Sequence, residues 1–379
     1  MYNTRNTSLL TGNAMETLFV IKDFPVSMSC IPTNFSNEKV LDMEFQICKK
    51  TGIIQLKKYP TFDDMYISAH NSSSGQVWND LFELMATKIL NIVDKMNNPK
   101  VLEIGGGALL LASKILKNNT NIEKYEIFEK NSSLKYSTDE RIHLIEEYFD
   151  SNTKLNYNPD IIIHSHVLEH VWNPVEFISA IKNISCNYHC FIVPNLQVTF
   201  EKKYTNAINF EHNFFITEPY IDTILYNNNF EIIEKEYYLD HSIIYITKYI
   251  EKEIIPQSFP NLYDKYNQLA IEFKDYHNNE IAKINEKIEN FDGIVYLFGG
   301  HIFSQFLINF GLKADKINCI LDNSKEKNKQ RLYGTKLIVE FPDIIKNNKN
   351  CAVILKVASY QEEIKKQLYE LNKDVVIIE

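Results

Sequence analysis

The 379-residue sequence has little glycine, proline or cysteine and no excess of positive charge. Glycine and proline number 11 each, which excludes collagen-like and Pro/Gly-rich repeat chains. The six cysteines form no Cys-x-x-Cys pair, so the chain has neither a disulfide framework nor an intact zinc motif. Lysine and arginine number 40 against 49 acidic residues, and the resulting net charge of -9 argues against a general nucleic-acid binder.

Long apolar runs are absent as well. No run approaches the ~18 residues that a membrane span needs, and the N-terminal stretch contains no apolar region typical of a signal peptide. We therefore expect a soluble, cytoplasmic protein without a membrane partner. Apolar residues make up 45% of the chain, which is enough to bury sizeable cores. The length suggests two or three domains.

The central part of the chain alternates between strand-like and helix-like patterns, as in βαβ units that build a parallel sheet. Apolar residues at helical spacing predict a helix over Val77–Met96. Phe230–Tyr238 and Ser242–Lys248 are joined by a short turn, which predicts an antiparallel hairpin at the end of the sheet. The other predicted strands are Val101–Ile104, Tyr125–Phe128, Ile142–Ile145, Ile161–Ile163 and Cys190–Val193, with helices over Leu109–Leu116 and from about Val175.

The regions on either side have different patterns. Residues 1–75 carry short strand-like runs (FVIKDF, IIQL), and residues 251–291 have the polar composition and helical spacing of a connector. After them come predicted strands at Ile294–Phe298, Ile317–Leu321, Cys351–Lys356 and Val375–Ile378, and a helix at Tyr360–Leu371. We therefore expect four segments: a small N-terminal domain (1–75), a central domain (76–250), a helical connector (251–291) and a C-terminal Rossmann-like α/β domain (292–379).

A glycine cluster, Gly105-Gly106-Gly107, follows the first strand of the central domain and precedes a helix. Such a turn lets a ligand approach the backbone closely, although glycine also serves tight turns for purely steric reasons. It is not the dinucleotide fingerprint, because Leu110 stands where GxGxxG needs its last glycine. Glu129 ends the next strand, where a carboxylate can accept hydrogen bonds from ribose hydroxyls. Together they predict a nucleoside-like ligand at the carboxyl ends of adjacent strands.

Two further groups of residues carry side chains that could do chemistry. His164, His166 and His170 follow the fourth strand. No further ligand is apparent beside them, and a metal site needs three or four converging ligands, so we expect no metal. Glu211 and His212 lie among aromatic residues after the fifth strand. They are candidates for a general base and the carboxylate that orients it, or for a loop whose aromatic rings pack on the sheet.

These motifs, in this order, resemble the class I S-adenosylmethionine-dependent methyltransferases. The resemblance covers residues ~77–250 and rests on the Glu-x-Gly-x-Gly turn, the acidic strand end and the more specific stretch His-Val-Leu-Glu-His-Val-x-x-Pro at 166–174. It implies an α/β, Rossmann-like core with an antiparallel terminal strand, and S-adenosylmethionine as the cofactor. Where the family often has a small residue, this chain has Leu109, which we expect to alter the start of the following helix.

The resemblance also implies roles for individual residues. Glu103, Gly105 and Gly107 surround the methionine part of the cofactor, and Glu129 holds its ribose. The residues expected near the adenine are Glu146, Glu147 and Tyr148, and those expected to line the pocket after the fourth strand are His164 and His166.

The order of segments is similar to that of the sugar C-methyltransferases of deoxysugar biosynthesis. These have a small zinc-binding domain, a central methyltransferase domain and a C-terminal α/β domain, and their catalytic loop reads Tyr-His-Glu-His. Glu211 and His212 match that loop, whereas Asn209 and Phe210 replace its first two residues. Cys48 matches one zinc ligand, but threonine stands where its partner belongs, so we expect no zinc.

This resemblance implies methyl transfer to a nucleotide-linked sugar or a related surface-polysaccharide precursor, with His212 as general base and Glu211 orienting it. A second glycine turn, Gly299-Gly300, and Asp322 at the end of the next strand would help to enclose that substrate. The alternatives are an O-methyltransferase acting on another small molecule, a non-catalytic nucleotide-binding module, and an NAD-dependent oxidoreductase, which the glycine spacing disfavours. The acceptor atom, the sugar and the oligomeric state are left open.

Overall fold

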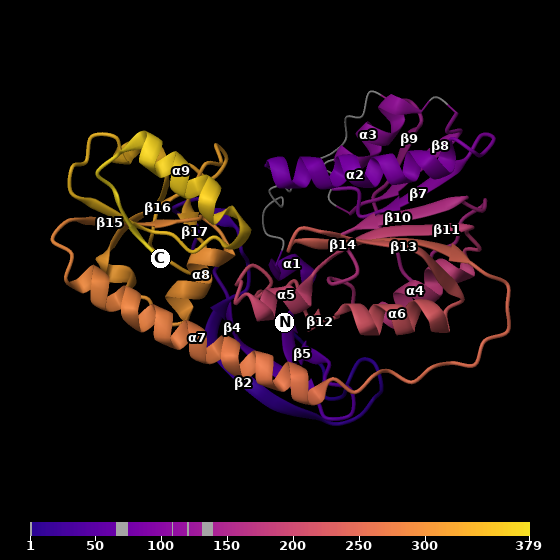
Figure 1. The fold of residues 1–379 in the computed structure, drawn as a ribbon, viewed down its shortest axis with the longest axis horizontal. Helices are drawn as coiled ribbons and strands as arrows, with labels where there is room; N and C mark the ends of the chain where they lie inside the picture. The colour runs from indigo at the N-terminus through magenta and orange to yellow at the C-terminus, as the bar shows by residue number, and fades with distance from the viewer. Residues whose placement is uncertain (1, 66–74, 108, 120, 131–138) are drawn as a thin grey trace. The chain divides into compact units, whose positions relative to one another are not determined.

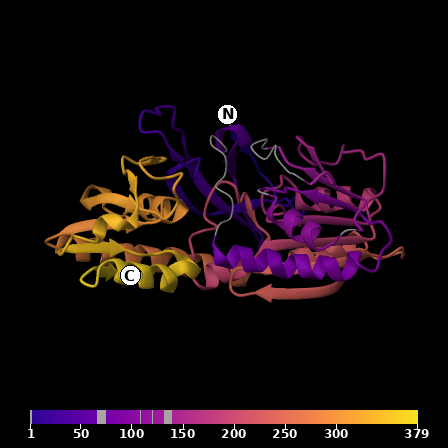
Figure 2. The same cartoon turned by 90° about the horizontal axis from the view of Figure 1, so that it is seen from above.

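The computed structural model describes residues 2–65, 75–107, 109–119, 121–130 and 139–379. The chain divides into two compact units, and the division does not follow the chain order. The first unit contains Met1–Ser68, Leu196–Phe215 and Asn261–Glu379, and the second contains Ala69–Asn195 and Ile216–Pro260. Among the described residues, no helix combines the length and apolarity that crossing a bilayer requires. The ribbon is shown in two views (Figures 1 and 2).

The second unit is built on a seven-stranded sheet with the order β13-β14-β11-β10-β7-β8-β9. Its strands are β7 (Lys100–Ile104), β8 (Lys124–Phe128), β9 (Ile142–Ile145), β10 (Ile161–Ser165), β11 (Tyr188–Pro194), β13 (Phe230–Tyr238) and β14 (Ser242–Tyr249). All neighbours are parallel except β14, which runs antiparallel to both β11 and β13. The predicted strands and the predicted terminal hairpin are therefore confirmed.

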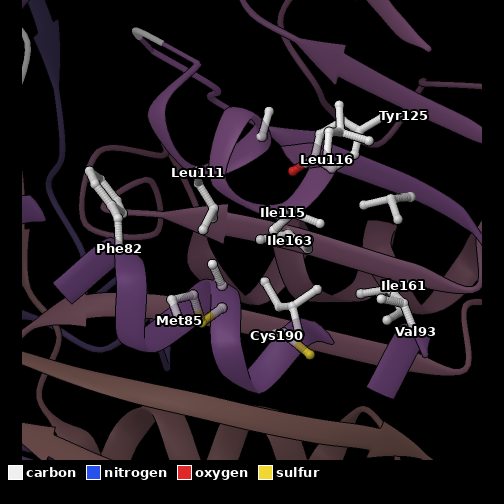
Figure 3. Close-up of a cluster of buried hydrophobic side chains, with 14 of the residues drawn as sticks. Phe82, Met85, Val93, Leu111, Ile115, Leu116, Tyr125, Ile161, Ile163 and Cys190 are labelled. Carbon is white, nitrogen blue, oxygen red and sulfur yellow. The ribbon is translucent and has the colours of Figure 1, made fainter. Parts of the chain in front are cut away.

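Helices cover both faces of this sheet, which explains why its central strands are almost continuously apolar. α2 and α3 lie on one face, and α4 and α6 on the other (Figure 1). These helices are α2 (Gln76–Val93), α3 (Leu110–Asn118), α4 (Pro174–Asn183) and α6 (Glu218–Asn227). Between α2, α3 and the sheet lies a continuous core that includes Phe82, Met85, Leu111, Ile115, Ile161, Ile163 and Cys190 (Figure 3).

The first unit contains a four-stranded antiparallel sheet with the order β12-β5-β4-β2. Its strands are β2 (Met15–Pro25), β4 (Val40–Cys48), β5 (Ile54–Leu56) and β12 (Phe214–Phe215). A second, two-stranded pairing joins β1 (Tyr2–Thr4) to β6 (Lys58–Pro60), next to the short helix α1 (Phe62–Met65). β12 and the helix α5 (Leu196–Glu201) follow β11 in sequence but belong to this unit.

A five-stranded parallel sheet completes the first unit, with the order β18-β16-β15-β19-β20. Its elements are β15 (Ile294–Phe298), α8 (Ile302–Asn309), β16 (Ile317–Leu321), β18 (Val339–Glu340), β19 (Cys351–Ile354), α9 (Gln361–Leu371) and β20 (Val376–Ile378). β17 (Arg331–Leu332) pairs with β3 (Cys30–Ile31), so the N-terminal and C-terminal parts of the chain are joined by backbone hydrogen bonds. The sequence does not reveal that pairing, and the bounds of the four predicted segments stay a prediction.

The predicted helical connector is α7, which spans Tyr263–Glu289. It begins later than the predicted segment because Pro256 and Pro260 lack a backbone donor and restrict the residue before them. The start of α7 is held by the β4–β5 turn, where the Leu262 N–H donates to the Thr51 carbonyl at 2.8 Å. In that turn Gly52 has a φ of +83°, and a Cβ there would lie 2.5 Å from the backbone carbonyl carbon of Leu262.

We therefore predict that Gly52→Ala lowers the free energy of unfolding by about 3 kcal/mol, because it adds a backbone overlap to a left-handed conformation. Gly12 is the matched control, since it has a φ of +69° but no atom within 4 Å of an added Cβ. Gly12→Ala should cost only about 1 kcal/mol. Urea unfolding followed by circular dichroism measures both, and equal losses would show that the contact with the start of α7 does not matter.

Candidate active site

The glycine cluster forms the turn from β7 into α3. Gly105 and Gly107 have φ angles of 73° and 47°, in the region that favours glycine. A Cβ on Gly105 would lie 2.6 Å from Cγ2 of Val167, and one on Gly106 would lie 2.5 Å from Cγ2 of Ile127. A Cβ on Gly107 would meet no atom within 4 Å. The first two glycines are therefore needed for packing, whereas the third borders open space.

The structure places Glu129 against this turn. Its Oε2 accepts a hydrogen bond from the Gly107 N–H at 3.1 Å. The glycine turn and the acidic strand end, which lie about 20 residues apart in the sequence, are thus brought into contact at the carboxyl ends of β7 and β8. The turn ends at Leu109, a buried residue with a φ of 58°, and α3 begins at Leu110. A left-handed, non-glycine residue at this point is a locally strained start to the helix.

Glu103 lies beneath the turn and is only 2% exposed. Its Oε2 accepts a hydrogen bond from the Tyr125 hydroxyl at 2.7 Å. Burial raises the pKa of Glu103 to about 7, and the nearby Glu129 adds to that rise, while the bond from Tyr125 opposes it. A carboxyl group in this state ionises readily when a cation binds beside it. Sequence reasoning found Glu103 but missed Tyr125, whose position in an apolar strand gives no sign of a polar partner.

A pocket of about 570 Å³ opens beyond β8 and β9. Phe128, Ile145 and Tyr148 give it apolar and aromatic surface, and Glu147 adds a carboxylate. Its full lining is Glu126, Phe128, Ile145, Glu147, Tyr148, Asp150, Asn152, Thr153, Lys154, Leu155 and Asn156. Two of the residues expected near an adenine ring, Glu147 and Tyr148, therefore lie beside a cavity.

His164 lies in the protein core and has no exposed surface. Its ring packs between Phe177 of α4 and Phe191 of β11, and its Nε2 lies 3.0 Å from Nε2 of His189. Burial lowers the pKa of both imidazoles, that of His189 to about 3. The pair is therefore neutral at pH 7, with one ring donating to the other. The cofactor-binding role that the resemblance implies for His164 stays a prediction.

His166 lies at the end of β10 and is partly exposed, with a φ of 53°. Its Nδ1 lies 3.0 Å from the Ser165 hydroxyl and its Nε2 lies 3.0 Å from the Ser242 hydroxyl. Trp78 of α2 packs edge-on against the ring at 4.6 Å between centroids. Of the two histidines proposed for the pocket, His166 is the one that lies at the strand end. Its place there was predictable, but its contacts with Trp78 and Ser242 were not.

Glu211 and His212 lie in the first unit, in a loop of residues 205–215 that follows α5 and ends with β12. The Asn209 Oδ1 accepts from the backbone N–H groups of Glu211 at 2.9 Å and His212 at 3.1 Å. Phe210 is buried, with its ring 6.0 Å from that of Phe24. The two residues that replace the family's Tyr and His therefore shape the loop and anchor it to β2.

The orientation of the His212 ring is set by a backbone carbonyl. Its Nδ1 lies 3.1 Å from the Ala207 oxygen. Because a carbonyl oxygen only accepts hydrogen bonds, this contact places the proton on Nδ1 and leaves the lone pair on Nε2. This is the tautomer that a general base acting through Nε2 requires.

The second glycine turn follows β15 and is bonded within its own unit. The Gly300 N–H donates to Asp322 Oδ2 at 2.8 Å, and Lys327 Nζ lies 3.1 Å from the same oxygen. The Cys30 thiol donates to the Gly300 carbonyl at 3.3 Å. The sequence analysis assigned the turn and Asp322 to one Rossmann-like unit, and the role of the turn in enclosing a substrate stays a prediction.

Hydroxyl groups surround Cys48, the residue that matches a zinc ligand of the sugar methyltransferases. Thr11 Oγ1 lies 4.0 Å from its sulfur. Burial raises the pKa of the Cys48 thiol, but hydrogen bonds from the Thr51 side chain, from nearby backbone N–H groups and from Ser8 lower it by more. All six cysteines are buried as free thiols. Hydroxyls are poor zinc ligands beside thiolates, and the expected absence of zinc stays a prediction.

Comparison with known proteins now bears on this geometry. Residues 77–235 match a family model described as a methyltransferase domain. The matched region contains the glycine turn, Glu129, the histidines after β10 and the loop of residues 205–215. Together with the mixed seven-stranded sheet, it confirms the predicted Rossmann-like methyltransferase core. No curated protein matches the chain, and the narrower likeness to sugar C-methyltransferases has no support from these comparisons.

Solved structures that resemble the methyltransferase domain include an S-adenosylmethionine-dependent methyltransferase from Aquifex aeolicus, at 13% identity and a TM-score of 0.37, covering 46% of this chain and 95% of that one. Another is the N-methyltransferase NodS from Bradyrhizobium japonicum in complex with S-adenosylhomocysteine, at 10% identity and a TM-score of 0.36, covering 47% of this chain and 90% of that one.

The buried histidine pair makes stability depend on pH. An unfolded histidine titrates near pH 6.5, whereas the buried pair stays neutral below that pH. The unfolded chain therefore binds more protons than the folded chain in this range. Stability should therefore fall as the pH drops from about 6.5 towards 4, by up to about 1.4 kcal/mol per pH unit for each histidine that stays neutral. Urea unfolding at several pH values measures this slope.

A double variant, His164→Leu with His189→Phe, should reduce that slope, because apolar groups replace both partners of the hydrogen bond. Part of the slope should remain, since burial also lowers the pKa of His241 and of His277 to about 4. His143→Leu is the control, since His143 is exposed, and it should leave the slope as it is in the wild type. A double variant with an unchanged slope would assign the acid sensitivity to other groups.

Proposed function

We propose that this chain transfers a methyl group from S-adenosylmethionine to a nucleotide-linked sugar or a related precursor. The observation that carries the first half of this proposal is the contact between the Gly107 N–H and Glu129, within a region that matches the methyltransferase-domain family. It joins a turn that admits a ligand to an acid that can hold ribose hydroxyls. The open space beside Gly107 fits a ligand at this point.

The cofactor would be held by groups of three kinds. Glu103 offers a buried negative charge to the ammonium group of its methionine part. Glu129 accepts hydrogen bonds from the ribose, and the pocket beside Phe128 and Tyr148 offers apolar surface to the adenine. When bound, the cofactor supplies a methyl group made electrophilic by a sulfonium, so the main task of the protein is to place the acceptor in line with it.

The buried state of Glu103 predicts how cofactor binding depends on pH. In the free protein its pKa is about 7, so below pH 7 the carboxyl must release a proton before it can pair with an ammonium group. Affinity for S-adenosylmethionine should therefore rise between pH 6 and pH 8, with proton uptake by the buffer. Calorimetry in buffers of different ionisation enthalpy measures both quantities.

Glu103→Gln should bind the cofactor about tenfold more weakly at pH 8, since a tenfold change needs only 1.4 kcal/mol, and should lose the pH dependence. Tyr125→Phe is the matched variant. It removes the hydrogen bond that favours the charged carboxylate, so the pH dependence should persist with its midpoint at higher pH. If wild-type protein bound neither S-adenosylmethionine nor its demethylated product, the proposed cofactor would be wrong.

For the acceptor, we propose that His212 takes the proton through Nε2 and that Glu211 supports it. The acceptor loses a proton to His212 and gains the methyl group on carbon or oxygen. The neutral sulfur product then leaves. The tautomer set by Ala207 supports this role for His212. The choice of a nucleotide-linked sugar rests on the order of segments and on the Glu211-His212 pair alone.

Mass spectrometry of products from a panel of nucleotide-linked sugars tests the acceptor. A mass gain of one CH₂ marks methylation, and fragmentation locates it. His212→Gln should lower kcat by about 10² to 10⁴-fold while cofactor affinity stays unchanged. Methylation of a different small molecule would favour the O-methyltransferase alternative. Cofactor binding without turnover on any substrate would favour a non-catalytic binding module, and full turnover by His212→Gln would refute the assigned base.

A further inference from the structure

Arg5 is a cation buried beneath the loop that carries His212, and it is only 7% exposed. Its guanidinium carbon lies 5.2 Å from the centre of the Tyr59 ring and 5.8 Å from that of Phe214, so aromatic faces flank the charge. Removing a cation from water costs several kcal/mol even after the protein relaxes around it. Ring faces recover only about 1 to 2 kcal/mol of that cost.

The same guanidinium is bonded to the residue that follows His212. Arg5 Nη1 donates to Asn213 Oδ1 at 2.6 Å and more weakly to the Asn213 carbonyl at 3.4 Å. That carbonyl also accepts from the Leu56 N–H at 2.9 Å. Residues 208 positions apart in the sequence are thus joined. A charged donor forms a stronger hydrogen bond than a neutral one, so the bond from Arg5 to Asn213 Oδ1 is stronger than the bond from the Leu56 N–H to the Asn213 carbonyl.

Between α5 and β12 the described residues of the loop form no helix or strand, and hydrogen bonds fix the loop on both sides of His212. On one side Asn209 closes a turn onto the backbone of Glu211 and His212. On the other side β12 pairs with β5 through Phe214 and Phe215. His212 lies between them, and Asn213 is the residue through which a side chain from the chain's N-terminus reaches it. A change at Asn213 would therefore move the His212 backbone and its contact with Ala207.

We propose that Arg5 is a positioning residue for His212: through Asn213 it locks the loop of residues 205–215 and holds the imidazole on the Ala207 carbonyl. The inference rests on the proposed role of His212 as general base. It assigns to an N-terminal residue a part in the methyl-transfer reaction, and it explains why a buried charge is kept at this position. Arginine suits the task better than lysine because its planar guanidinium both stacks on rings and donates in fixed directions.

The first measurement needs neither cofactor nor substrate. Nitrogen-15 NMR of the histidine rings reports the tautomer of His212, with His212→Gln identifying its signals. We expect the Nδ1–H form in the wild type and a mixture of tautomers in Arg5→Met, which keeps the side-chain length and loses the donor. Arg5→Lys, which keeps the charge, should lie between them. An unchanged tautomer in Arg5→Met overturns the proposal whatever happens to activity.

The second measurement is kinetic. Arg5→Met should lower kcat by about tenfold or more with little change in KM, because a small misplacement of a catalytic group carries a large cost. Asn213→Ala should have the same effect, and the double variant should be no worse than either single one, since both remove one interaction. Additive losses would show that Arg5 and Asn213 act separately and would overturn the proposal.

A stability control separates positioning from general loosening of the first unit. Tyr333→Phe removes the contacts of the Tyr333 hydroxyl with the backbone of Lys39, away from the loop. It should lower stability without changing the His212 tautomer or kcat. If the chain showed no methyl transfer at all, the proposed function would fail, while the NMR result would still decide whether Arg5 holds the loop.

Discussion

The packing of the β7 turn against the neighbouring strand ends is the constraint on which the methyltransferase domain depends. A side chain at Gly105 would collide with Val167, and one at Gly106 with Ile127. Because neither position carries a Cβ, the turn packs closely against Ile127 of β8 and Val167 after β10. This packing brings the Gly107 N–H within hydrogen-bond distance of Glu129. A Cβ on Gly107 would meet no atom within 4 Å, so the turn is closed towards the sheet and has open space on the side of its third glycine. Rigid support with one open side is what a ligand site at a strand end requires.

Burial decides the charge state of three titratable side chains in the unit that contains this turn. Glu103, His164 and His189 are all removed from water, and in each case burial favours the neutral form. Their consequences differ because their neighbours differ. The two histidines bond to each other through Nε2 while both Nδ1 atoms lack a hydrogen-bond partner among the described residues, whereas Glu103 lies under the glycine turn and accepts a hydrogen bond from Tyr125. The same physical effect keeps two bases neutral at the histidine pair and raises the pKa of an acid at Glu103.

The general-base candidate depends on a different part of the chain from the one that its sequence position suggests. His212 follows β11 and falls within the matched methyltransferase region, yet its loop packs with the N-terminal sheet through β12, Phe210 and Asn213. The loop is therefore held by residues that the family match does not include, such as Phe24 and Arg5. Residues of the N-terminal sheet thus contact the loop that carries His212.

Much of the fold was predictable because local patterns carry it. Short apolar runs located the strands of the seven-stranded sheet, helical spacing located the long connector helix, and the scarcity of glycine made the cluster at Gly105 stand out. Glu129 could be placed beside that cluster, because parallel strands end at the same edge.

Only the tertiary structure could show which residues serve one another across long separations. The bond from Tyr125 to Glu103, the pairing of His164 with His189 and the contact of Arg5 with Asn213 leave no local pattern. Each is a polar contact formed by burial, and burial depends on what the rest of the chain packs around it. The sequence by itself determined the elements and the kind of ligand turn, through spacing and residue type. The fold decided which titratable groups burial keeps neutral, such as His164 and His189, and which charged group contacts the loop, as Arg5 does. The reason is that desolvation depends on how the whole chain packs.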